Sequence, residues 1–192
     1  MFNEIYSCFG NNTKTIEVLD ILLGGKGVIR QCFDEDEIGL VRMFCEKYGL
    51  FCEVSPLRLE LVGGGDVFSN KGRFSEKGGL NIVYISKDQK QAMLGCLYEL
   101  KQDHVGLGRV LGYPECCISF FIEKNRLGNY NPVNKPTNEW TNISQRDRDV
   151  VLLSHFPCSN DCEKSIMIAK RRMKLIEKFN QELGEKIKSV LG

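Results

Sequence analysis

The sequence predicts an α+β fold: a mixed N-terminal part with a small sheet, then a C-terminal helical part that ends in one long amphipathic helix. Three observations predict this class. Nearly all glycines lie before residue 113, where they divide the chain into short elements. The run LRLEL at residues 57–61 alternates apolar and polar side chains, as a half-buried strand does. From residue 160 onward, apolar residues recur at helical spacing instead.

The N-terminal part is expected to alternate short helices and strands. Asp34 is a typical helix N-cap, and Gly49 stops the helix that it opens. Ser86 and Gln89 have the spacing of a capping box. Such a mixture of elements is typical of an α+β region. We expect helices over residues 15–23, 34–48 and 86–102, and strands over residues 28–33, 57–61 and 80–85.

Beyond residue 103 the strand signals stop, and helices are expected over residues 104–111, 114–125 and 160–191. Between the last two, residues 125–147 carry six asparagines, two prolines and the only tryptophan, Trp140. A stretch of this length without periodicity is typical of a functional loop or of disorder. The sequence therefore divides into an α+β region, 1–103, and a helical region, 104–192, which we expect to pack as one compact unit.

Composition excludes several classes of protein. The 26 basic and 25 acidic residues give a formal net charge of +1, so no global field attracts nucleic acid or an acidic membrane. No apolar run approaches the ~20 residues that a membrane helix needs. The N-terminus, MFNEIYSCFG, lacks the pattern of a signal peptide. We therefore expect a cytoplasmic protein that binds neither membranes nor nucleic acid, and the oligomeric state is left open.

The nine cysteines fall into two groups. They are too few for a disulfide scaffold, which takes roughly 8–10% cysteine. In a reducing compartment they serve as core hydrophobes, nucleophiles or metal ligands. Five of them stand alone in apolar runs and are expected to be small core side chains. These are Cys8, Cys32, Cys45, Cys52 and Cys96.

The remaining four cysteines form two pairs, in GYPECC (residues 112–117) and HFPCSNDC (residues 155–162). In each motif a proline precedes the cysteines and an apolar-periodic helix follows, which places both pairs in first helical turns. There the helix dipole and free N–H groups stabilise thiolates. Cys158 and Cys162 are four residues apart and are expected to share one helix face. If the two helix ends meet, all four sulfurs should lie within ~7 Å of one another.

Cys116, Cys117, Cys158 and Cys162 are thus candidate metal ligands. Four thiolates in a tetrahedral arrangement indicate zinc or an iron–sulfur cluster. Adjacent ligands constrain a single tetrahedral ion badly, whereas a cluster offers them separate irons, so this spacing favours an iron–sulfur cluster over zinc. If one cysteine is not a ligand, the cluster keeps an open iron where a substrate binds.

Three further residues are candidates for catalytic roles. His155 precedes Cys158 by three residues. It is a candidate ligand or general base, and the alternative is that it only caps a backbone carbonyl. Arg109 and Tyr113 lie one helical turn apart and are suited to orient a carboxylate or phosphate, or else serve only packing and surface roles. The basic stretch at residues 164–178 is expected to be a solvated helix face.

Residues 111–121, LGYPECCISFF, and 153–163, LSHFPCSNDCE, resemble a prokaryotic domain family of unknown function, DUF family 483. That family pairs a G-Y-P-x-C-C segment with an H-x-P-C-S-x-x-C segment, and the resemblance covers roughly residues 80–180. It implies that the four paired cysteines and His155 belong to one site. It implies no particular reaction.

Three functional hypotheses follow. The first is a thiolate-ligated, iron–sulfur protein, an enzyme or a sulfur-handling protein, that acts on a small molecule, with the 125–147 loop and Trp140 over its pocket. The second is a structural zinc module in an interaction protein. The third is a metal-free enzyme in which one cysteine attacks the substrate and another resolves the intermediate.

Overall fold

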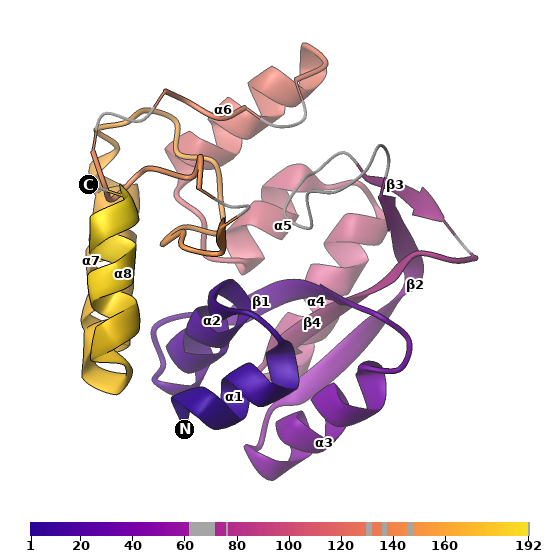
Figure 1. Ribbon diagram of the computed structural model, residues 1–192. Coiled ribbons are helices and arrows are strands. Elements are labelled where there is room, and N and C mark those ends of the chain that lie inside the picture. Colours follow the sequence, from indigo (N-terminus) through magenta and orange to yellow (C-terminus); the bar gives the residue numbers. More distant parts are fainter. Residues whose placement is uncertain (62–71, 76, 130–131, 136–137, 146–147, 192) are drawn as a thin grey trace. The chain divides into compact units, whose positions relative to one another are not determined.

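The computed structural model describes residues 1–61, 72–75, 77–129, 132–135, 138–145 and 148–191 (Figure 1). Helices together with a small antiparallel sheet confirm the predicted α+β class. The chain divides into two compact units, which we call the sheet unit (Ile21–Tyr113) and the helical unit (Met1–Asp20 with Pro114–Gly192). This division differs from the expected regions 1–103 and 104–192, because the N-terminal helices group with the C-terminal part.

The described strands form one antiparallel sheet in the order β1-β4-β2-β3 (Figure 1). Strands β1 and β4 lie where the sequence predicts strands, and β2 includes the predicted run 57–61 but begins six residues earlier, at Phe51. The pairing of β2 with β4 shifts between Val54 and Arg58, around Pro56, which has no N–H to donate to the sheet. Strand β3 was not predicted. The strands are β1 (Val28–Phe33), β2 (Phe51–Leu61), β3 (Gly72–Ser75) and β4 (Leu80–Ser86).

Helices α3 (Ile38–Lys47), α4 (Gln89–Leu100) and α5 (His104–Val110) complete the sheet unit. Helix α4 packs against β1, β4 and β2. The expected capping box is wrong, because the Asp88 carboxylate, not Ser86, accepts from the N–H groups of the first turn of α4. Helix α3 likewise begins later than expected, after Glu37. The core between α4 and the sheet consists of Val28, Ile82, Tyr84, Ala92, Cys96 and Leu111.

The helical unit joins the two ends of the chain. The N-terminus of α2 is capped by Asp149, whose carboxylate accepts from the Thr13 backbone N–H at 2.9 Å and the Thr13 hydroxyl at 2.6 Å. This contact spans 136 residues of sequence, and it places the N-terminal helices with the C-terminal ones. Helix α1 was not predicted. The helices are α1 (Phe2–Phe9), most of α2 (Asn12–Leu22), α6 (Glu115–Arg126), α7 (Glu163–Phe179) and α8 (Gln181–Leu191).

The long C-terminal helix is divided in two at Asn180. The Asn180 backbone is extended, with φ −155° and ψ 88°, and its side-chain oxygen accepts from the Leu183 N–H at 3.0 Å, as a helix N-cap does. Glu177 and Lys188 form an ion pair, which requires α8 to fold back along α7 (Figure 1). None of the described helices is long and apolar enough to cross a membrane.

Candidate metal centre

Four cysteines of the helical unit gather at the N-termini of α6 and α7. Helix α6 begins directly after Pro114, so Cys116 and Cys117 lie in its first turn, as expected. Cys162 is the N-cap of α7. Cys158 lies in the irregular segment before α7, so the expectation that it shares a helix face with Cys162 is wrong.

The sulfur atoms of these four residues all lie within 4.8 Å of one another. The Cys116 sulfur is 3.9 Å from that of Cys117 and 3.8 Å from that of Cys162. The sulfurs of Cys117 and Cys162 are 3.7 Å apart. The two motifs therefore meet in one cluster that could hold a metal ion.

Sequence adjacency does not prevent Cys116 and Cys117 from serving one ion. Neighbouring side chains on a helix point about 100° apart around its axis. Two adjacent cysteines were therefore expected to fit poorly around a single ion. In the first turn of α6, however, both side chains direct their sulfurs to the same point, 3.9 Å apart. The sequence argument against a single tetrahedral ion is therefore removed.

A buried hydrogen-bond network supports the sulfurs. The Ser165 hydroxyl, which is fully buried, donates to the Cys162 sulfur at 3.3 Å and lies 3.4 Å from the Cys117 sulfur. His155 Nε2 is 2.9 Å from the same hydroxyl oxygen. Because Ser165 donates its hydrogen to a sulfur, its oxygen accepts from the imidazole. His155, which is also buried, thus reaches the cluster through Ser165.

The electrostatics of the thiols differ. Burial raises the pKa of Cys117 far above the ordinary value for a thiol. Burial, followed by contact with the thiols of Cys116 and Cys162, raises the pKa of Cys158 to about 11. Burial also opposes ionisation of Cys162, but hydrogen bonds from the Ser165 hydroxyl and backbone N–H outweigh it and lower its pKa to about 7. Without a metal, Cys162 therefore ionises at a lower pH than Cys117 or Cys158.

The asparagine-rich segment holds the loop that carries Cys158. Asn134 Nδ2 donates to the Pro157 carbonyl at 2.7 Å, and Asn138 Nδ2 donates to the Asn160 carbonyl at 2.7 Å. The Thr141 hydroxyl donates to the same Asn160 carbonyl at 2.7 Å. These residues were not singled out from the sequence. The many asparagines of residues 125–147 could have indicated this role. Amide side chains form hydrogen bonds with backbone groups that lack partners in a helix or sheet.

We expect Asn138→Ala to loosen the Cys158 loop and weaken metal retention. The substitution removes the bond to Asn160 and the acceptor for the Trp140 N–H, at a cost of about 1–3 kcal/mol. The measurement is the rate at which loaded protein yields its metal to a chelator, with about tenfold acceleration expected. Asn125→Ala, on α6, is the matched control and should leave the rate unchanged. Equal rates for both variants would contradict the role of Asn138.

The other candidate residues are placed as follows. Arg109 is exposed on α5, and Tyr113 follows that helix, with Lys26 Nζ 5.4 Å from the centre of its ring. Both belong to the sheet unit, so their proposed action beside the cysteines stays a prediction. The catalytic role of His155 also stays a prediction. Trp140 is half-buried beside Lys170, and its role as a pocket cover is likewise untested.

Fold and site together define an α+β protein with a four-cysteine cluster able to hold a metal ion. The chain belongs to the family described as "Protein of unknown function (DUF483)", whose model matches residues 91–191. The matched segment includes all four cysteines, Ser165 and His155. No curated protein and no solved structure matches the chain.

Proposed function

We propose that Cys116, Cys117, Cys158 and Cys162 bind one zinc ion as four thiolates. The observation that carries this proposal is the spacing of the sulfurs. With Zn–S bonds of about 2.3 Å, a tetrahedron places its four sulfurs about 3.8 Å apart. Three of the sulfur–sulfur distances are 3.7, 3.8 and 3.9 Å. The donors therefore already stand at the separation that a single ion requires.

The same spacing argues against the iron–sulfur cluster that the sequence favours. A cluster contains several irons and inorganic sulfide, and each thiolate points away from its centre. Thiolates on different irons must therefore stand farther apart than thiolates on one ion. All four sulfurs here lie within 4.8 Å of one another, and this close spacing favours one ion over a polynuclear cluster.

In this proposal the zinc ion takes ligands from three segments of the helical unit and so links them. Two ligands come from the first turn of α6, one from the loop before α7, and one from the N-cap of α7. A zinc ion with four thiolates carries a net charge of −2, and the positive ends of both helix dipoles stabilise that charge. A four-thiolate site of this kind contributes directly to folding.

Metal analysis of purified protein, with Cys158→Ser as the diagnostic variant, tests the proposal. Stoichiometric zinc in a colourless protein is expected, and cobalt substitution should give the visible bands of tetrahedral thiolate coordination. Cys158→Ser should lose the zinc. Cys45→Ser is the control, because Cys45 is buried in α3 of the sheet unit. It should keep the zinc despite a packing cost.

Other results would select the other hypotheses. Iron and sulfide in equal amounts, with a coloured protein, would replace zinc by an iron–sulfur cluster. Protein that lacks metal, and in which a single thiol reacts rapidly, would favour a cysteine nucleophile without metal.

We also expect zinc binding to release protons and to strengthen as the pH rises. The pKa of Cys158 is about 11 and that of Cys117 is raised as well, so both are protonated at pH 7 in the metal-free protein. Zinc must displace at least these two protons, and its apparent affinity should rise by at least about 100-fold per pH unit near neutrality. Calorimetry in two buffers of different ionisation enthalpy measures the release. Release of fewer than two protons per zinc near pH 7 would contradict this arrangement.

A further inference from the structure

The four sulfurs of the centre are not equally protected. Cys116 is exposed, whereas Cys117 and Cys162 are buried and Cys158 is half-buried. The protein therefore shields Cys117 and Cys162 from a reagent in solution and shields Cys158 in part, but it leaves Cys116 accessible. Accessibility alone singles out Cys116.

Hydrogen bonding separates Cys116 and Cys158 from the two buried cysteines. The sulfur of Cys117 accepts from the Cys158 backbone N–H at 3.4 Å, and that of Cys162 accepts from the Ser165 hydroxyl at 3.3 Å. In the described part of the chain, the sulfurs of Cys116 and Cys158 form hydrogen bonds only with other cysteine sulfurs. A hydrogen bond to a thiolate stabilises its lone pair and lowers its nucleophilicity. Of these two residues Cys116 is the exposed one, so it presents the most reactive lone pair to a reagent in solution.

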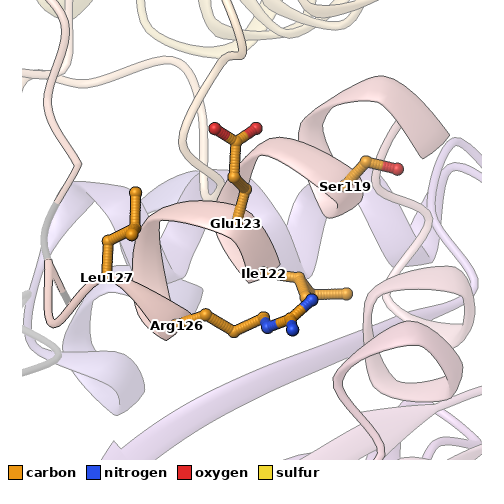
Figure 2. A pocket seen from close by; sticks show the side chains of 5 residues that line it. All are labelled: Ser119, Ile122, Glu123, Arg126 and Leu127. Carbon is orange, nitrogen blue, oxygen red and sulfur yellow. The ribbon is translucent and has the colours of Figure 1, made fainter.

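An open hollow of about 560 Å³ lies along α6 on the C-terminal side of Cys116 and is lined by Ser119, Ile122, Glu123, Arg126 and Leu127. Ser119, at the near end of the hollow, follows Cys116 by three residues, so the two side chains lie on one stripe of the helix. Figure 2 shows these side chains along α6, with the Arg126 guanidinium beside Ile122 and the Glu123 carboxylate pointing away from it. This surface can take both apolar and charged parts of a molecule whose reactive end lies at Cys116.

We propose that Cys116 is an alkyl-accepting thiolate that attacks small alkyl electrophiles, which rests on the zinc centre proposed above. The Cys116 sulfur donates a lone pair to a saturated carbon and forms an S–C bond. The bond from that carbon to its leaving group breaks, and the leaving group departs with the bonding pair. No proton moves and no oxidant is needed. The charge of the centre changes from −2 to −1, which relieves the repulsion among four thiolates.

Limiting iodomethane on zinc-loaded protein tests the proposal. Native mass spectrometry follows zinc and methyl on the same molecule, and peptide mapping locates the methyl group. We expect the first product to carry both zinc and one methyl, and Cys116 to react at least about tenfold faster than any other cysteine. Zinc-loaded protein in which another cysteine reacts first, or methylation only of zinc-free protein, would overturn the proposal. Protein without zinc would instead refute the zinc centre itself.

Ser119→Phe tests the approach along α6 without altering a ligand. Ser119 is exposed, so a larger side chain there is tolerated, and it stands one turn from Cys116 on the same stripe. We expect about tenfold slower reaction with iodoacetamide at unchanged zinc content. Lys174→Phe is the control, since Lys174 is exposed on α7 and about 18 Å along that helix from Cys162. An unchanged rate in Ser119→Phe would show that reagents do not approach along this face.

Discussion

Removal of zinc by a chelator is expected to open the segment from residue 132 to the first turn of α7. Most of the described residues of this segment form neither helix nor strand, and side-chain hydrogen bonds and the cysteine cluster hold their backbone. Structural zinc sites in finger peptides contribute about 10–16 kcal/mol. That exceeds what a few hydrogen bonds of about 1 kcal/mol each can replace. In the proposed zinc centre, the metal would thus contribute more to the order of the described residues of this segment than these hydrogen bonds do.

Hydrogen exchange measured with and without chelator checks this expectation. Amides of residues 157–162 and of the first turn of α7 should lose protection. Amides of β1 and β4 provide the internal control, because they belong to the sheet unit and pair with each other. Restoring zinc should restore protection. Unchanged protection around Cys158 after complete metal removal would refute a structural role for the centre.

Local sequence signals predicted the parts of the fold that depend on local chemistry. Strand β1 lies at the predicted residues, and α6 begins after Pro114 as expected, because a proline and an apolar period are sufficient to define a helix start. Asn180 shows the limit of periodicity. Apolar residues continue at helical spacing through the break, because α7 and α8 both bury an apolar face. Asparagine is a common helix N-cap, but the unbroken apolar spacing on both sides of Asn180 led to the prediction of a single helix.

The support of the site could not be predicted, because it depends on contacts between distant residues. The paired motifs predicted which cysteines meet. They did not predict that Ser165 would link His155 to the sulfurs, or that Asn138 would hold the backbone at Asn160. Nor does a local pattern indicate that Asp149 caps α2. Contacts between residues so far apart in sequence produce no local or periodic pattern from which they could be predicted.

The strongest of these long-range contacts is a buried ionic cluster around Arg172. Its guanidinium donates to Asp20 Oδ2 at 3.1 Å, to Glu17 Oε1 at 3.2 Å and to the Leu152 carbonyl at 3.1 Å. Arg172, Glu17 and Asp20 are all nearly inaccessible to solvent. Arg171 also contacts Asp20 Oδ2, at 2.9 Å, but its side chain is 45% exposed. The cluster joins α7 to α2 within the helical unit.

Arg172→Ala is therefore expected to destabilise the helical unit by about 3–5 kcal/mol, because it removes the buried charge that contacts both the Glu17 and the Asp20 carboxylates. Asp20 Oδ1 already has no hydrogen-bond partner among the described residues, so this carboxylate has little other support. Urea unfolding followed by circular dichroism measures the loss. Arg171→Ala removes a partly exposed partner of the same carboxylate and should cost at most about 1 kcal/mol. Equal losses in the two variants would mean that burial of Arg172 adds nothing to the strength of the contact.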